Sequence, residues 1–491
     1  MEIDALKHSG RTNTLYRYLP LAACLLLALG LRLLLWSGPL HQLANDEVEY
    51  ATVARDLLAG RGWVFYESYP WLRAPLYNLF LAGSLWLADG DLHRAALPNI
   101  ALSVGNVALS YQLALHMVGR RAALLAALLT AVLWTNVSFA SLYMAETLFT
   151  FCFLAGLVVL CGAGRSNRGA GGMRAARSGL VVLCGAGRSN RGAGGMRAAR
   201  SGRLLRPYLG ARRVGARRVG AYIAAGLFLG LATLARSASL LFLPVVAIWI
   251  WLAVRDRAAA SSRRTWRQAT APWVCAGAFF FTVCLTILPW TIRNYSAYDR
   301  IIPVETGLAY NLWAFSEPRE SLEQINLTLA AIPNPAERSD YATARGLERL
   351  REDPAILARK LWPNWTYLTR IKPIEDRFVL ESYYLDVRLP LFASALVLDD
   401  ALYLLIALAG IAGLCLHRGT TRSMFALATP QALCALWLVY MAATMLLTHG
   451  EARYRHFFFP LLIPFAAWLL SRGAVRAARE PPRPREPPRP R

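Results

Sequence analysis

The chain has 491 residues, of which 56% are hydrophobic, and its formal net charge at pH 7 is +24. Apolar runs of about 18 or more residues recur along it, with the polar residues gathered between them, which excludes a soluble globular protein and indicates a polytopic α-helical membrane protein. The excess charge sits in a few segments, so we attribute it to positively charged cytoplasmic loops that attract anionic lipid, and we expect no nucleic-acid partner.

The N-terminal segment has the features of an uncleaved membrane anchor. Residues 1–17 contain Lys7, Arg11 and Arg17, and the apolar run 18–36 follows with no small-residue cleavage site after it. Basic residues ahead of a first span favour a cytoplasmic N-terminus. We therefore expect a cytoplasmic tail at 1–17 and an N-terminal transmembrane module at 18–162, whose loop 37–73 lies on the outer side.

Eleven apolar segments are candidate membrane spans: 18–36, 74–88, 96–118, 122–136, 144–162, 221–235, 238–254, 271–290, 401–416, 424–447 and 457–470. If all of them crossed, the basic residues Arg120 and Arg121 would lie outside, against the usual charge bias. The segments 74–88 and 122–136 are short, and short apolar runs are often re-entrant or interfacial. We expect one of these two not to cross fully.

A basic segment divides the membrane modules. Residues 162–220 hold fourteen arginines, and residues 157–179 recur unchanged at 180–202. We expect 163–220 to be a disordered cytoplasmic loop, since two copies are too few for a solenoid. The remaining divisions expected are a continued membrane module at 221–294, an outer-face region with amphipathic helices at 295–398, C-terminal membrane helices at 399–470 and a basic, proline-rich cytoplasmic tail at 471–491.

The first outer loop contains a cluster of carboxylates in NDEVEY, residues 45–50. From there to Gly60 the spacing predicts an amphipathic helix in the interface plane, with Asp46, Glu47 and Glu49 off its apolar stripe. The stripe consists of Ala44, Val48, Ala51, Val53, Ala54, Leu57 and Leu58. Charged residues cost about 2.5–3.5 kcal/mol each at the centre of a membrane helix, so acids near a span point to function.

Other charged residues stand where an apolar run begins or ends. Glu146 opens a span, where it could serve only to complement the helix dipole. Arg453 and Arg455 precede the last span on the expected outer side, against the usual bias, and a phosphate is a natural partner for a guanidinium. Balance by the neighbouring Glu451 is the alternative for these two arginines.

Taken together in order, these motifs resemble the GT-C superfamily of membrane glycosyltransferases, closest to the dolichyl-phosphate-mannose–protein mannosyltransferases and the aminoarabinose transferases. The matching stretches are the acids after the first span, R-x-P-L-Y at 73–77, S-x-x-x-x-E before 147, G-L-x-L-G-L-A-x-L-x-R at 226–236, P-W-x-I-R-N-Y at 289–295 and R-Y-R at 453–455. The chain departs from the usual pattern at Ala74 and Ser237, where proline is frequent.

The resemblance implies an all-α GT-C fold with about 10–12 transmembrane helices and an interfacial helix in the first outer loop. It places the catalytic aspartate on Asp46, as a general base, and gives Glu47 and Glu146 to the acceptor, the sugar or a divalent cation. Metal-free catalysis, with arginine stabilising the leaving phosphate, is equally compatible with it. The substrate-binding residues implied are Arg73, Tyr77, Arg293, Asn294, Arg453 and Arg455.

The function expected is transfer of a sugar from a polyprenyl-phosphate donor to an acceptor hydroxyl, with inversion, on the non-cytoplasmic side of a bacterial inner membrane. The acceptor could be a lipid, a glycan or a protein, and membrane lipids are the other partners. A transporter or lipid flippase is the alternative, but it would more often bury charges mid-span and show two matching halves. A non-catalytic assembly subunit would leave the acids without a role.

Overall fold

The computed structural model describes residues 2–38, 40–43, 45–165, 205–259, 266–371, 389–420 and 427–477. Within these ranges all regular secondary structure is helical, which confirms the predicted all-α class. The α-helices are α1 (Glu2–Trp36), α2 (Asp46–Leu58), α3 (Leu76–Leu87), α4 (Leu92–Ala95), α5 (Leu97–Met117), α6 (Arg120–Val132), α7 (Trp134–Ser138), α8 (Glu146–Arg165), α9 (Leu205–Ala235), α10 (Leu243–Ala259), α11 (Trp266–Tyr298), α12 (Gly307–Ala314), α13 (Leu322–Ala330), α14 (Pro335–Glu352), α15 (Ala355–Thr369), α17 (Leu389–Thr420), α18 (Pro430–Leu447) and α19 (Phe459–Ala477). Short 3₁₀ helices add η1 (Val64–Glu67), η3 (Ser237–Phe242) and η4 (Ala452–Phe457).

Eight helical segments of the described chain are long and apolar enough to cross a membrane: Tyr18–Trp36, Leu92–Met117, Glu146–Ala163, Arg218–Ala235, Ser237–Ala259, Thr270–Tyr298, Val397–His417 and Pro430–Leu447. Two shorter apolar helices, Leu76–Leu87 and Phe459–Gly473, accompany them. Eight long and two short helices agree with the predicted polytopic architecture.

The segment 122–136 is one of the two that we expected not to cross fully, and the structure agrees with this. It breaks at Leu133 into α6 and α7, and the 13 residues of α6 extend only about 20 Å, against a hydrocarbon core of about 30 Å. The disordered loop expected at 163–220 differs at both ends, because α8 runs to Arg165 and α9 begins at Leu205. Most of the repeat, from 166 to 202, lies outside the described residues, as does the tail after 477.

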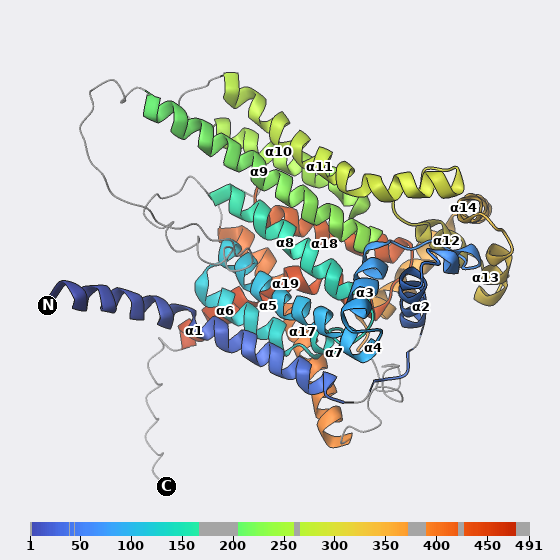
Figure 1. Cartoon of the computed structure of the whole chain (residues 1–491), viewed down its shortest axis with the longest axis horizontal. Coiled ribbons are helices and arrows are strands. Elements are labelled where there is room, and N and C mark those ends of the chain that lie inside the picture. Colours follow the sequence, from blue (N-terminus) through green and yellow to red (C-terminus); the bar gives the residue numbers. More distant parts are fainter. Residues whose placement is uncertain are drawn as a thin grey trace, which may run out of the picture.

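Small residues let the membrane helices approach closely. In α9, Gly226 and Gly230 lie one turn apart and face α11, where an added Cβ at Gly226 would come within 2.5 Å of the Phe279 carbonyl oxygen. Helices in a membrane associate through such close van der Waals packing, because the hydrophobic effect contributes little to helix association in lipid. Gly226 and Gly230 therefore allow α9 to pack closely against α11. Helix α8 packs against α9, and α5 packs against α8 (Figure 1).

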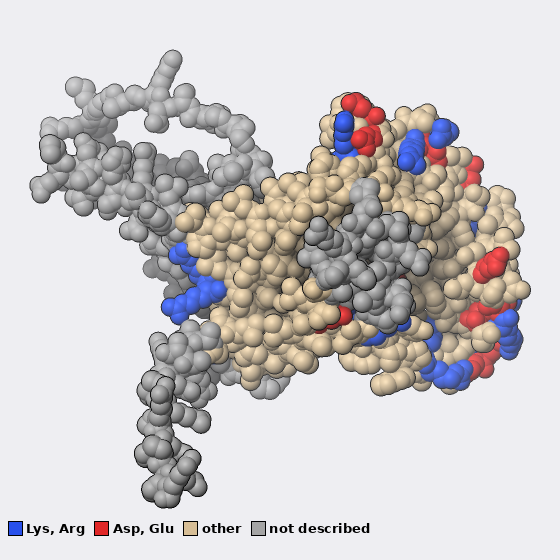
Figure 2. Space-filling view, turned by 90° about the horizontal axis from the view of Figure 1, so that it is seen from below, with Lys and Arg blue, Asp and Glu red and all other residues tan. Residues whose placement is uncertain are grey.

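Segments far apart in the sequence gather at one end of the bundle. Helices α2, α12, α13 and α14 all lie at that end, while α1 begins at the opposite end (Figure 1). Figure 2 shows charged side chains concentrated toward this same end, a smaller basic group at the other, and a largely uncharged surface between. The predicted amphipathic helices of the 295–398 region are present as α14 and α15.

Candidate active site

The backbone turns sharply just before the acidic helix. Asn45 has φ 50° and ψ −120°, a left-handed conformation that a side-chain-bearing residue adopts at a cost of about 1–3 kcal/mol. Helix α2 begins at the next residue, so Asp46, Glu47 and Glu49 occupy its first turn and complement the helix dipole. Residues held in such strained conformations are often found at functional sites.

Helix α2 buries acids as well as part of its predicted apolar stripe. Ala51, Val53 and Ala54 are buried as predicted, whereas Val48 and Leu58 of the same stripe are 47% and 43% exposed. Glu47 and Glu49, which lie off the stripe, are only 1% and 2% exposed. Carboxylates can be buried only where hydrogen bonds and opposite charges compensate the lost hydration. The partners described below supply that compensation.

Asp46 lies between two arginines from distant parts of the chain. Arg73, just before α3, donates from Nη2 to Asp46 Oδ1 at 2.9 Å, and Arg453, in η4, donates from Nη1 to Oδ2 at 2.7 Å. The three side chains are largely buried, with exposed fractions of 14%, 13% and 24% in that order. The structure thus joins the segment between α1 and α3 to the segment before α19.

Glu49 is the second anion at Arg73. The Nε of Arg73 donates to Glu49 Oε2 at 2.7 Å, and the Tyr66 hydroxyl donates to Oε1 at 3.1 Å. The Arg73 guanidinium also lies 5.5 Å from the ring centroids of Tyr50 and Trp71, within range of cation–π attraction. Arg73 is therefore held by two carboxylates and two aromatic rings.

The electrostatic environment separates the two acids. Burial by itself would raise the pKa of Asp46, but the charges of Arg73, Arg453 and Arg236 outweigh it and lower that pKa. Burial raises the pKa of Glu49, although Arg73 opposes the change. Asp46 is consequently the more firmly ionised carboxylate of the pair.

Glu146 joins the same charge cluster through Arg236, the residue at which the G-L-A-x-L-x-R stretch ends. Arg236 Nη1 donates to Glu146 Oε1, and the charge of Arg236 also acts on Asp46. The other carboxylate oxygen, Oε2, is buried and has no hydrogen-bond partner among the described residues. Asp46 and Glu146 thus contact neighbouring arginines, with one oxygen of Glu146 left to accept a further hydrogen bond.

Glu47 lies behind this cluster and is tied to the scaffold. His41 Nε2 is 2.9 Å from Glu47 Oε1, and the backbone N–H of Tyr143 donates to the same oxygen at 2.9 Å. Tyr77 is also buried, with its ring edge-on to Tyr50 at a centroid distance of 4.8 Å. Both residues are packed under Asp46.

Three further candidates make hydrogen bonds with other parts of the described structure. Arg293 donates to Asn294 Oδ1 at 3.2 Å, and Asn294 donates to the Ile302 carbonyl oxygen at 3.0 Å, which fixes the turn after α11. Arg455 donates to the Leu368 carbonyl oxygen at 3.3 Å and lies over the Tyr403 ring. The contacts described for Arg293, Asn294 and Arg455 are therefore structural ones.

Glu49 and Arg236 belong to the cluster although the sequence analysis assigned them no role. A signal existed for Glu49, because residues three apart share a helix face, which places it beside Asp46. Arg236 ends a recognised motif, but its pairing with Glu146 spans 90 positions and has no local signature.

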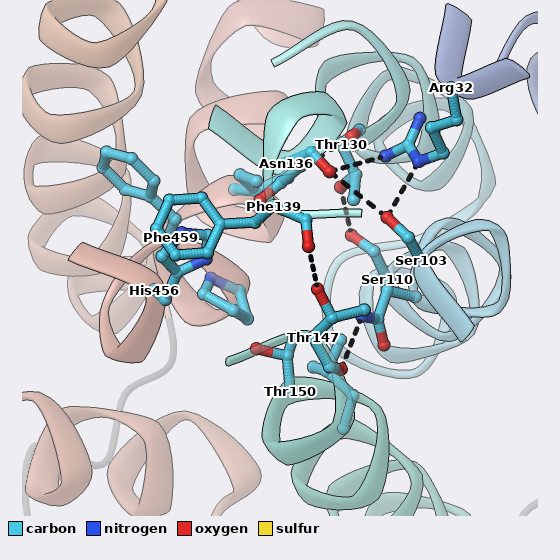
Figure 3. Close-up of a pocket in the computed structure, with 14 residues that line it drawn as sticks. Arg32, Ser103, Ser110, Thr130, Asn136, Phe139, Thr147, Thr150, His456 and Phe459 are labelled. Carbon is cyan, nitrogen blue, oxygen red and sulfur yellow. Dashed lines mark hydrogen bonds between the residues drawn. The ribbon is translucent and has the colours of Figure 1, made fainter. Parts of the chain in front are cut away.

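A second polar region lies inside the membrane bundle and is shown in Figure 3. Arg32 of α1 is fully buried and donates to Ser103 Oγ at 2.8 Å and to the Ala131 carbonyl oxygen at 3.1 Å. Thr150 and His456 line the same cavity, and Thr150 Oγ1 and His456 Nε2 have no hydrogen-bond partner among the described residues. The cavity of about 20 Å³ can hold a water molecule.

The carboxylates of the site do not form a metal-ligand set as they are arranged. Among the described residues no three His, Cys, Asp or Glu side chains converge in a way that could hold an ion. Asp46, Glu49 and Glu146 are each already paired with an arginine, and Glu47 with a histidine. We therefore base no step of the chemistry on a divalent cation.

The chain shares its fold with solved membrane oligosaccharyltransferases, in agreement with the fold that the resemblance predicted. It is similar to an oligosaccharyltransferase of Archaeoglobus fulgidus in its apo form, with a TM-score of 0.52 and 14% identity over 94% of this chain and 52% of the other. The structure of AglB from Archaeoglobus fulgidus in complex with an inhibitory peptide and a dolichol-phosphate also has a TM-score of 0.52, with 15% identity over 94% and 51%.

A third structure, of the Archaeoglobus fulgidus oligosaccharyltransferase with Zn and sulfate, has a TM-score of 0.50 and 15% identity, covering 93% of this chain and 49% of the other. The chain therefore spans about half the length of the structures that it matches. No family model and no curated protein sequence matches it. Identities this low establish a shared fold only.

Proposed function

We propose that this protein is an integral-membrane glycosyltransferase that moves a sugar from a polyprenyl-phosphate donor to an acceptor hydroxyl. The observation that carries the proposal is Asp46 held between Arg73 and Arg453 at the bundle end that bears α2. A general base beside two phosphate-binding groups is what such a transfer needs. One of the similar structures contains a dolichol-phosphate, which is a lipid phosphate of this class.

The arginines would bind the phosphate of the donor. Guanidinium groups bind phosphate through paired N–H···O hydrogen bonds. Arg73 and Arg453 already bind one anion, the carboxylate of Asp46. In our account the donor phosphate displaces the Asp46 carboxylate from these two arginines. As the anomeric C–O bond breaks, the charge that develops on the departing phosphate is stabilised by the same groups.

Asp46 would accept the proton of the acceptor hydroxyl. With both arginines on its carboxylate it is a weak base, because their charges lower its pKa. Once the phosphate takes those arginines, Asp46 loses part of their field and its basicity rises. The acceptor oxygen attacks the anomeric carbon opposite the leaving phosphate, its proton passes to Asp46, and the anomeric centre inverts.

The remaining acids would position the reactants. Glu146 has one oxygen without a hydrogen-bond partner in the described structure, which suits a hydrogen bond from a sugar or acceptor hydroxyl. Glu47, bound by His41 and the Tyr143 N–H, would hold α2 in register and act indirectly. Tyr77 would support the ring of Tyr50, which lies against the Arg73 guanidinium.

We place the active site on the non-cytoplasmic side of the membrane, in a bacterial inner membrane. The basic N-terminus and α2 lie at opposite ends of the bundle (Figure 1), and a basic N-terminus favours the cytoplasm. Under this orientation 1–17 is a cytoplasmic tail, and the loop 37–73 and the region 295–398 face outward.

The test compares two aspartate variants of the full-length protein in liposomes. Mass spectrometry of polyprenyl-phosphate sugars in host membranes, with and without the protein, first identifies the donor that accumulates when it is missing. Asp46→Asn keeps the shape and removes the base, so we expect transfer to fall by about 10²–10⁴-fold. Asp56→Asn, on the same helix but paired with Arg61, is the matched control and should retain activity.

The transporter or flippase alternative makes a different forecast in the same liposomes. It requires lipid movement without sugar transfer, and Asp46→Asn would then alter transbilayer movement of the donor while no glycosylated product formed in either protein. Undiminished product formation by Asp46→Asn would refute the proposed mechanism.

A further inference from the structure

An open groove lies beside the candidate active site, at the same end of the bundle. Tyr69, Pro70 and Trp71, from the loop before α3, form one wall, and Glu323 and Asn326 of α13 contribute to the other. The groove has a volume of about 420 Å³, within the range of small-molecule sites. Two of its lining residues, Tyr69 and Trp71, also contact Arg73 or its carboxylate partner Glu49.

The first wall is fixed to the region after α11 by a buried arginine. Arg338 of α14 donates to the Tyr66 carbonyl oxygen at 2.8 Å, and its guanidinium also donates to the carbonyl oxygens of Glu67 and Tyr69. Five donors in a planar group suit such a set of backbone acceptors. The Tyr69–Trp71 segment is therefore held in place against α14.

The second wall is fixed by a capping box at the start of α13. Ser321 Oγ accepts from the Gln324 backbone N–H, and Gln324 Oε1 accepts from the Ser321 N–H. This motif stabilises the first turn of a helix. The positions of Glu323 and Asn326 are consequently set by a regular helix, not by a loop.

The chemistry of the walls suits a sugar ring. A pyranose has an apolar C–H face, which packs on aromatic rings such as Tyr69 and Trp71, and an edge of hydroxyls, which need acceptors and donors. Glu323 supplies an exposed carboxylate, and the amide side chain of Asn326 also lines the groove. An acyl chain against Glu323 would remove water from its carboxylate, at a cost in free energy.

The groove also adjoins the reacting centre. The Trp71 ring lies 5.5 Å from the Arg73 guanidinium, and Arg73 donates to Asp46. The groove is therefore linked to Asp46 through Trp71 and Arg73. We propose that the groove binds a carbohydrate unit of the acceptor, so that the acceptor class is a glycan or glycolipid; this rests on the proposed glycosyl transfer.

Saturation-transfer difference NMR tests the groove directly, with the full-length protein in lipid nanodiscs free of glycoside detergent. The probes are the methyl glycosides of glucose, galactose, mannose, N-acetylglucosamine and arabinose, and the peptide Asn-Val-Thr. We expect at least one methyl glycoside to receive saturation mainly on the ring protons of one face. Asn326→Ala and Glu323→Gln should each reduce this signal at least threefold.

Glu337→Gln is the matched control, because Glu337 is an exposed glutamate of the neighbouring α14 outside the groove and should leave the signal unchanged. No saturation of any methyl glycoside, equal signals in wild type and Asn326→Ala, or saturation of the peptide alone would overturn the inference. Glycoside binding with no loss of transfer in Asp46→Asn would refute the enzyme mechanism but keep the groove. Loss of transfer in that variant without glycoside binding would do the reverse.

Discussion

Two buried arginine environments in this protein differ in the partners that they offer. At the α2 end, Arg73 and Arg453 bind the carboxylate of Asp46, an anion that another anion can replace. Inside the bundle, Arg32 binds a serine hydroxyl and backbone carbonyl oxygens, and none of its hydrogen-bond partners among the described residues is a carboxylate (Figure 3). These acceptors are parts of the helix scaffold, so an incoming anion does not displace them from Arg32.

This difference separates a binding role from a structural one. A phosphate that takes Arg73 and Arg453 leaves the Asp46 carboxylate nearby without them, which favours proton uptake by Asp46 in the proposed mechanism. Arg32, by contrast, ties the peripheral helix α1 to α5 and to the end of α6. Changes at the two sites should therefore affect different properties, activity at one and stability at the other.

The largest expected effect comes from removing an arginine that binds Asp46. Arg453→Gln removes a charge that faces the departing phosphate, so we expect kcat/KM for transfer to fall by about 10²–10³-fold, as for the loss of one preorganised donor. Arg61→Gln is the matched control, since Arg61 pairs with Asp56 and is exposed, and it should stay within about threefold. Equal losses in the two variants would count against a special role for Arg453.

Removing the inner arginine should lower stability instead. Arg32→Met leaves Ser103 Oγ and the Ala131 carbonyl oxygen without their donor, and unpaired buried groups cost about 1–3 kcal/mol each. We expect a clear fall in the melting temperature, measured by thermal unfolding in nanodiscs, with transfer per folded molecule within about threefold of wild type. An unchanged melting temperature with lost activity would reverse the assignment of the two sites.

A smaller effect sharpens the description of the inner region. Burial lowers the pKa of His456 to about 4, whereas an unfolded histidine titrates near 6.5. The folded protein binds a proton at His456 less readily than the unfolded chain does. The free energy of unfolding therefore keeps its full value above pH 6.5 and falls as the pH drops towards 4, by up to about 1.4 kcal/mol per pH unit.

Thermal unfolding between pH 7 and pH 4 measures this slope. His456→Gln cannot gain the proton, so its melting temperature should fall less steeply with acidification than that of the wild type. Parallel curves for the two proteins would show that His456 is not the group responsible.

The sequence predicted much of the fold because apolar runs and their lengths are local properties. The helix that starts within NDEVEY runs from Asp46 to Leu58, just before Gly60, as its spacing indicated. Val53 and Ala54 of its predicted stripe are buried. The burial of Glu47 and Glu49 could not be predicted from the pattern, because it depends on His41 and Arg73 as partners.

The candidate site was only partly accessible from the sequence. Motif order pointed to Asp46, Arg73 and Arg453, which the structure brings together although 407 positions separate the first from the last. The same reasoning also selected Arg455, which lies two residues further on but contacts backbone carbonyl oxygens. Which way neighbouring side chains of a short 3₁₀ helix point depends on tertiary packing, and the sequence does not reveal it.

Binding of a plain polyprenyl phosphate tests the exchange of carboxylate for phosphate most directly. If Asp46 and the phosphate compete for Arg73 and Arg453, Asp46→Asn should bind this lipid about tenfold more tightly than the wild type, equivalent to about 1.4 kcal/mol, while Arg453→Gln binds it more weakly. Isothermal titration in nanodiscs gives both values. Weaker or unchanged binding by Asp46→Asn would contradict the account.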